Sequence, residues 1–139
     1  GSRSLRLGTP RGARVQAPLS ATGRALLAAM SDAEVVELLG EDAVFPQLTE
    51  RSATTMPGLL EVLATARRRG WALDAEESFR GIVGVAVPLE GWAPTDPPLA
   101  LGVAIRAAEA DYERIERVGE ALRDAAAALT NPFSSAVRH

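Results

Sequence analysis

Four segments of the chain carry apolar residues at the three- and four-residue steps of an amphipathic helix. The first, residues 20–30, reads SATGRALLAAM, and either Ser20 or Thr22 is placed to cap its first turn. The second begins at Ser31 with SDAE, a capping-box pattern, and would stop at Gly40. Because one segment begins where the other ends, the pattern predicts two short consecutive helices.

The other two helical segments are longer. Residues 55–70, TMPGLLEVLATARRRG, have Pro57 in the first turn, and their three arginines suit the negative end of the helix dipole. Residues 111–129 carry the longest amphipathic pattern, which the following NPF stops because proline cannot continue a helix. Each segment therefore predicts a helix with one apolar face to pack against the rest of the domain.

Strand patterns lie on either side of the first three helices. SLRL, residues 4–7, alternates leucine with polar residues, and residues 15–19 predict a second short strand. Further strands are predicted to begin at residues 71–73 and to cover residues 82–87 and 99–107, the last two joined by a proline-rich loop. The order of strand, three helices, strands and long helix predicts an α+β fold, with an antiparallel sheet covered by helices.

The composition narrows the possible functions. The chain has 139 residues, is 47% apolar and has no cysteine, which fits one domain without disulfides or thiolate zinc sites. A net charge of −3 without a basic stripe argues against direct nucleic-acid binding. The sequence has neither an apolar run of membrane-spanning length nor a secretory signal core, so we expect a cytoplasmic location and no membrane partner.

The stretch WALDAEESFRG, residues 71–81, gathers three carboxylates, Asp74, Glu76 and Glu77. Two carboxylates can do acid–base chemistry, but no nucleophile–base pair stands out, and the one histidine is His139 at the chain end. Calcium loops need oxygen ligands at a spacing that this stretch does not match. We therefore expect no enzyme, no metal and no cofactor. A solvated hairpin edge is the favoured interpretation, and the rim of a ligand pocket is the alternative.

Three further features allow both a structural and a functional interpretation. Small residues at the start of the helix at 20–30 favour close packing, but they also leave room for a ligand carboxylate near the helix amides. Gly84 lies within a strand, where glycine often marks a close approach of backbone or ligand. Arg106 is a solvated edge charge if it lies on the outer face of the sheet, whereas on the inner face it needs an anion.

Three stretches are similar to one known family. VQAPLSATGRALLA (15–28) aligns with the end of PLHATALGKALLA, and ARRRGWALDAEES (66–78) is similar to an arginine-rich helix that runs into RGYAVDDEE. GIVGVAVPLEG, LALGVAIRAAEA and the last helix then follow the family's VAAPV strand, AALSVSGP strand and closing helix. Through these residues the chain resembles the C-terminal effector-binding domain of the IclR family of bacterial transcription regulators, over about residues 4–130.

The resemblance implies a GAF-like, profilin-like antiparallel sheet covered by helices, with a pocket for a small organic effector between one face of the sheet and the helices. The effector-binding domain would span residues 3–130 without the first helix and two strands of the family domain, and residues 131–139 would form a flexible tail. It also implies self-association as a dimer or tetramer, and DNA binding only through a domain absent from this chain. The alternative is a ligand-free oligomerisation module with a degenerate pocket.

Seven positions correspond to the family's pocket contacts. The residues so implied as ligand-binding are Ala21, Thr22, Gly23, Asp74, Gly84, Ala104 and Arg106. The family's histidine falls at Pro18, its arginine at Val83 and its two strand serines at Ala104 and Arg106. Most polar groups of the usual pocket are thus replaced, so the pocket would take a larger, more apolar ligand, use Arg106 as a new anion anchor, or be degenerate. We expect Arg106 either to hold a ligand carboxylate, the preferred interpretation, or to pair with Asp74.

Overall fold

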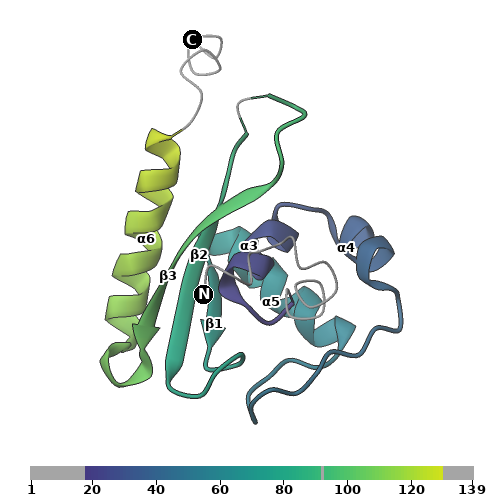
Figure 1. The fold of residues 1–139 in the computed structure, drawn as a ribbon, viewed down its shortest axis with the longest axis horizontal. Helices are drawn as coiled ribbons and strands as arrows, with labels where there is room; N and C mark the ends of the chain where they lie inside the picture. The colour runs from purple at the N-terminus through teal and green to yellow at the C-terminus, as the bar shows by residue number, and fades with distance from the viewer. Residues whose placement is uncertain (1–17, 92, 130–139) are drawn as a thin grey trace.

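The structure is a computed structural model that describes residues 18–91 and 93–129 (Figure 1). The described elements, in chain order, are α3 (Ala21–Ala28), α4 (Asp32–Leu39), α5 (Met56–Arg69), β1 (Ala72–Ala75), β2 (Ile82–Leu89), β3 (Leu99–Arg106), the 3-10 helix η1 (Ala107–Glu109) and α6 (Tyr112–Ala128). This order confirms the predicted α+β class. No helix among the described residues is long and apolar enough to cross a membrane.

The helix ends follow the predicted local signals. Ser20 caps α3, because its side chain accepts a hydrogen bond from the amide of Gly23 at 3.1 Å. Ser31 and Glu34 form the capping box, in which each side chain accepts a hydrogen bond from the other residue's amide. α5 ends at Gly70, whose φ of +89° is left-handed and therefore favours glycine.

The three strands form one antiparallel sheet in the order β1-β2-β3. In Figure 1, α6 covers one face of this sheet, α3 and α5 cover the other, and α4 lies outside them. The α6 side is filled by large residues: Trp71, Val83, Val85, Val87, Ile105 and Leu122. The α3 side is filled by alanines: Ala21, Ala25, Ala66, Ala72 and Ala86. Small side chains let α3 approach the sheet closely, which places its first turn directly over β2.

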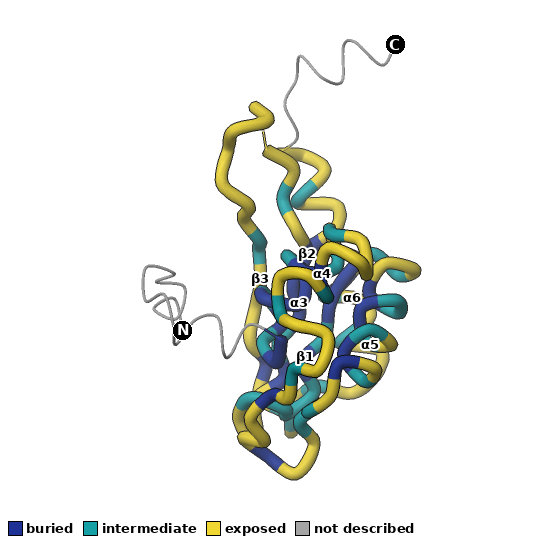
Figure 2. The backbone as a smooth tube through the Cα atoms, turned by 90° about the vertical axis from the view of Figure 1, so that its right-hand side faces the viewer, coloured by how far each residue is buried: buried dark blue, intermediate teal, exposed yellow. Residues whose placement is uncertain are grey.

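A third cluster joins α3, α4 and α5 away from the sheet, through Leu27, Val35, Phe45, Met56, Leu59 and Leu63. Figure 2 shows that the buried backbone gathers where the helices meet the sheet, while the β2–β3 hairpin extends past them and is exposed. The connection between β2 and β3 is thus a loop, as its prolines predicted.

Several boundaries differ from the sequence-based prediction. The first described strand begins at Ala72 rather than Trp71, and β3 ends at Arg106 because the backbone turns into η1 at the next residue. Of the short strand predicted at 15–19, only Pro18 and Leu19 are described, and they form a buried turn. The strand predicted at 4–7 and the tail at 131–139 lie outside the described residues.

Candidate functional site

The sheet brings three of the predicted site residues into one row. Asp74 on β1 is the cross-strand partner of Gly84 on β2, and Gly84 is the partner of Ala104 on β3. Directly opposite residues of antiparallel strands point to the same face, so all three face α3. A Cβ added at Gly84 would lie 3.1 Å from the Cβ of Ala21 and 3.6 Å from that of Asp74. The first turn of α3 therefore lies directly on this row.

The next row towards the hairpin loop is packed equally closely. A Cβ added at Gly102 on β3 would lie 3.0 Å from Cγ2 of Thr22 and 3.2 Å from the Cβ of Ala86. Thr22 is partly exposed and Gly23 is buried, whereas Ala104 is exposed. Asp74, Gly84 and Ala104 thus share one face of the sheet, which α3 covers at Gly84 and Gly102, while Ala104 remains exposed.

The carboxylate of Asp74 is buried, with the residue only 6% exposed. Its Oδ1 accepts hydrogen bonds from the amides of Glu77 at 2.8 Å and Ser78 at 3.2 Å, so it organises the turn that follows β1. Burial raises the pKa of Asp74 above its ordinary value, while these hydrogen bonds and the charge of Arg24 act in the opposite direction. The interpretation of this stretch as a solvated edge is therefore wrong for Asp74.

Arg24 is the charged residue of this region that the sequence-based prediction missed. It is fully buried in α3, and its guanidinium donates to both carboxylate oxygens of Glu77, at 2.6 and 2.7 Å. It also donates to the carbonyl oxygens of Pro18 at 2.7 Å and Leu73 at 2.9 Å. Every contact of this bidentate pair lies within the protein, so its role is to fix α3 against β1. The signal was available, because the related stretch PLHATALGKALLA has a cation at the same position.

The turn after β1 is held from a second side by the loop that precedes α5. The hydroxyl groups of Thr49 and Ser52 donate to the carbonyl oxygens of Glu76 at 2.6 Å and Glu77 at 2.7 Å, and the amide of Ala53 donates to the Glu77 carboxylate at 3.1 Å. Glu76, the one described non-glycine residue with a positive φ, adopts 60°. The carboxylates of this turn are thus engaged in structure and do not form a catalytic pair.

Arg106 does not pair with Asp74. Its side chain is 77% exposed, and its guanidinium forms an ion pair with Glu109 in η1. Strand alternation does put Arg106 on the same face as Ala104, but it lies at the end of β3, where the chain leaves the sheet. The alternative of an internal pair with Asp74 is therefore wrong, and the arginine faces solvent at the border of the row.

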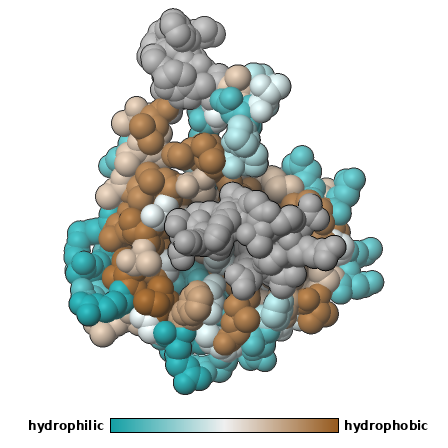
Figure 3. Space-filling model, viewed as in Figure 1, coloured by the Kyte–Doolittle hydropathy of each residue, from teal (hydrophilic) through white to brown (hydrophobic). Residues whose placement is uncertain are grey.

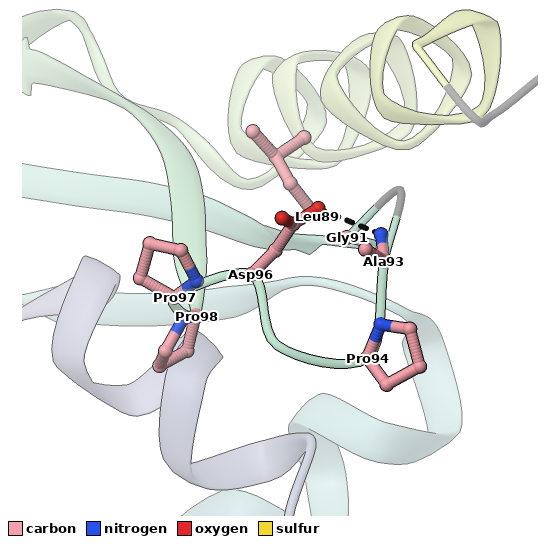
Figure 4. A pocket seen from close by; sticks show the side chains of 7 residues that line it. All are labelled: Leu89, Gly91, Ala93, Pro94, Asp96, Pro97 and Pro98. Atoms are coloured by element: carbon pink, nitrogen blue, oxygen red, sulfur yellow. Dashed lines mark hydrogen bonds between the residues drawn. The ribbon is translucent and has the colours of Figure 1, made fainter.

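Two surface cavities lie at the tip of the β2–β3 hairpin, away from the row. One, of about 420 Å³, is lined by Leu89, Gly91, Ala93, Pro94, Asp96, Pro97 and Pro98 (Figure 4). The other, of about 400 Å³, lies between the hairpin and the end of α6. In Figure 4 the carboxylate of Asp96 accepts a hydrogen bond from the amide of Ala93, at 2.8 Å, so this group fixes the loop. Neither cavity includes a residue of the predicted site.

Sequence comparison identifies regulatory proteins. The family model described as "Bacterial transcriptional regulator IclR C-terminal" matches residues 1–131. The HTH-type transcriptional regulator XynR of Escherichia coli K12 is 30% identical over 120 residues, which are 86% of this chain and 46% of XynR. The glycerol operon regulatory protein of Streptomyces griseus is 45% identical over 42 residues, 30% of this chain and 16% of that protein. The chain thus spans about half the length of XynR.

Solved structures give the same result. The Agrobacterium tumefaciens repressor BlcR superposes with a TM-score of 0.73 at 31% identity, over 82% of this chain and 46% of BlcR. The C-terminal domain of E. coli KdgR gives 0.69 at 27% identity, over 80% of this chain and 66% of that domain. An Acinetobacter PobR inducer-binding domain, a double mutant in complex with 3-hydroxybenzoic acid, gives 0.70 at 25% identity, over 83% and 65%. All these relatives are transcriptional regulators rather than enzymes.

Proposed function

The chain belongs to the IclR family of bacterial transcriptional regulators, and we propose that it senses a small organic acid on the α3 face of its sheet. The observation that carries this proposal is the row of Asp74, Gly84 and Ala104 under the first turn of α3. Gly84 in this row is packed against Ala21, whereas Ala104 is exposed and Thr22 is partly exposed, so a small molecule would lie over Ala104 near the start of α3. The PobR domain, a structural relative, is an inducer-binding domain in complex with an aromatic acid, which supports a ligand of this class.

The polar contacts would come from the border of the row. The ion pair of Arg106 with Glu109 is exposed on both sides, and exposed pairs are worth about 0–1 kcal/mol. A ligand carboxylate can therefore replace Glu109 at little cost and bind the guanidinium in a bidentate manner. The hydroxyl group of Thr22 and the amides at the start of α3 would supply further hydrogen bonds. Four other residues would define the shape of this site without forming charged contacts with the ligand: Asp74, Gly84, Ala21 and Gly23.

The whole protein would act as a regulator in the bacterial cytoplasm. In this proposal the chain associates as a dimer or larger assembly, and DNA is bound by a domain outside the 139 residues. An effector changes regulation only if it binds one arrangement of the subunits better than another, because a ligand with equal affinity for both shifts nothing. The chain alone, which has a net charge of −3, would not bind operator DNA.

A thermal-shift experiment tests the sensing proposal with 3-hydroxybenzoate and its uncharged analogue 3-hydroxybenzyl alcohol. An acid at 100 times its dissociation constant should raise the unfolding free energy by about 2.7 kcal/mol. Arg106→Ala should abolish the response to the acid and leave the weak response to the alcohol unchanged. Arg80→Ala is the matched control, because Arg80 is an exposed arginine with a single surface partner, Glu50. An absent response to a panel of aromatic and aliphatic acids would favour the ligand-free oligomerisation module.

A further inference from the structure

The turn that follows β1 lies between the proposed effector site and a surface loop. Residues 76–78 are named here the clamped turn, and residues 48–53 the clamp loop. In Figure 1 both lie at the lower end of the sheet, where the chain passes from β1 to β2 and where the connection from α4 to α5 comes down beside it. Polar contacts reach the clamped turn from both sides, so the turn connects the site with the loop.

On the side of the site, the clamped turn is bound by α3 and by Asp74. Arg24, the residue after Gly23 in α3, donates to both carboxylate oxygens of Glu77, at 2.6 and 2.7 Å. Asp74 accepts the amides of Glu77 and Ser78. The Arg24 side chain is fully buried and that of Glu77 is 14% exposed, so water competes little for these bonds. A displaced first turn of α3 must therefore either move Glu77 or break a buried ion pair.

On the other side, the clamp loop binds the same residue. The amide of Ala53 donates at 3.1 Å to Oε1 of Glu77, the oxygen that also accepts from Arg24. The hydroxyl group of Ser52 donates to the Glu77 carbonyl oxygen at 2.7 Å and accepts the amide of Thr49 at 3.0 Å. One carboxylate thus holds α3 on one side and the clamp loop on the other.

Two ion pairs join the same segments at the surface. Arg80 pairs with Glu50 at 2.7 Å and Arg51 pairs with Glu76 at 3.2 Å, and both arginines are mostly exposed. Figure 3 shows hydrophilic side chains at this lower end of the molecule. Exposed pairs contribute little and rearrange easily, so the position of the clamp loop depends on Glu77 rather than on these charges.

The backbone of the clamped turn is strained at Glu76. Its φ of 60° is left-handed, and a non-glycine residue keeps such a conformation only where the surrounding contacts hold it. The Thr49 hydroxyl donates to its carbonyl oxygen at 2.6 Å, and its own carboxylate accepts the amide of Gly81 at 3.0 Å. Loss of the clamp contacts therefore gives access to a more relaxed backbone, so the turn has two discrete arrangements.

We propose that Glu77 couples the effector site to the clamp loop, so that a change at the first turn of α3 alters the stability of the loop. This inference rests on the effector site proposed above and names how the rest of the domain reads that site. An effector bound to the amides at the start of α3 keeps this turn in place, and the loop then stays closed on Glu77. Without effector, each opening of the turn weakens the bonds of Glu77 with Arg24 and Ala53. The clamp loop continues to Thr55, the N-cap of α5, so its state reaches that helix.

Amide exchange, measured by NMR on the 139-residue chain, tests this coupling without a ligand. Ser20→Ala removes the cap of α3, and Asp111→Ala removes the cap of α6, which accepts the amide of Arg114 at 2.8 Å. Loss of a cap weakens a helix start about fivefold. Ser20→Ala should accelerate exchange at Ala53 by at least about threefold and leave Arg114 unchanged, whereas Asp111→Ala should accelerate Arg114 and leave Ala53 unchanged. An equal response of Ala53 to both variants would overturn the coupling.

Glu77→Gln tests the residue that carries the coupling. Glutamine can keep the oxygen that accepts from Ala53, but its amide group cannot accept from Arg24. In this background Ser20→Ala should no longer accelerate exchange at Ala53, and an undiminished response would overturn the role of Glu77. Arg24→Lys, which keeps the charge and loses the bidentate geometry, should abolish the response in the same way and replaces Glu77→Gln if that variant does not fold.

A measurement with 3-hydroxybenzoate separates a failure of the coupling from a failure of sensing. If the acid raises the melting temperature of the wild type, it should also slow exchange at Ala53 more than at Arg114, and this difference should disappear in Glu77→Gln. An acid that raises the melting temperature but slows both amides equally would overturn the coupling alone. If no acid of the panel changes the melting temperature, sensing is overturned, and the comparison of Ser20→Ala with Asp111→Ala still decides the coupling.

Discussion

Replacing Arg24 by methionine should be among the most destabilising single changes in this domain. Arg24 is fully buried and makes four hydrogen bonds, two to the Glu77 carboxylate and two to backbone carbonyl oxygens. Methionine fills part of the volume but leaves the Glu77 carboxylate, 14% exposed, without its cation. Removing one partner of a buried pair costs about 3–5 kcal/mol. Against a total of about 5–15 kcal/mol, that loss should lower the melting temperature by roughly 10–15 °C.

Urea unfolding followed by circular dichroism would measure this loss. Arg80→Met is the matched control, because the Arg80–Glu50 pair has a similar distance, 2.7 Å, but is 75% and 62% exposed, so its loss should cost less than about 1 kcal/mol. The double variant Arg24→Met/Glu77→Met removes both charges, and its cost should be below the sum of the single costs by at least about 1 kcal/mol. An Arg24→Met variant no less stable than Arg80→Met would refute the assignment of Arg24 as the group that fixes α3 on β1.

Three further outcomes are expected. Burial raises the pKa of Asp74 above 3.8, so its protonated form is favoured by folding, and its contribution to stability should fall as the pH rises from about 4 through the raised pKa. Urea titrations at several pH values should therefore show that the difference in unfolding free energy between wild type and Asp74→Asn is most favourable to wild type at acid pH. If this difference instead grew in favour of wild type as the pH rises, it would contradict the raised pKa. Gly119→Ala should cost about 1–3 kcal/mol in thermal unfolding, because the new Cβ would lie 2.4 Å from the ring of Trp71; a neutral effect would mean that α6 can move away from the sheet. Ser20→Ala should cost about 1 kcal/mol through loss of the α3 cap, and amide exchange at Gly23 should accelerate, whereas unchanged exchange there would count against the cap.

Local signals located the helices accurately. The capping residues Ser20 and Ser31, and the stop at Gly70, act through hydrogen bonds and dihedral angles within a few residues, and the structure has them as predicted. The antiparallel sheet also followed from the order of elements. The strand ends were less accurate: the start of β1 and the end of β3 differ by one residue each, and β2 continues two residues beyond the predicted end, to Leu89. Strand ends depend on where the neighbouring strand stops.

The candidate site likewise has features that the sequence predicted and features that it did not. The resemblance named Asp74, Gly84 and Ala104 as pocket positions, and the cross-strand pairs place these three residues in one row. The bonding of the charged groups was not predicted. Arg24 was taken as part of an ordinary helix, and Arg106 was expected to face inward, whereas the first is buried and the second is exposed.

The sequence by itself therefore determined the helices, the antiparallel sheet and the resemblance to one regulator family. Only the tertiary structure decided which carboxylate meets which arginine. Arg24 and Glu77 are 53 residues apart along the chain, and no local spacing relates them. Their pairing depends on the alanine-lined contact that brings α3 onto β1 and β2, where a buried charge must find a partner. The same contact buries Gly23 but leaves Ala104 exposed among the described residues, and that difference is a property of packing that no residue pattern encodes.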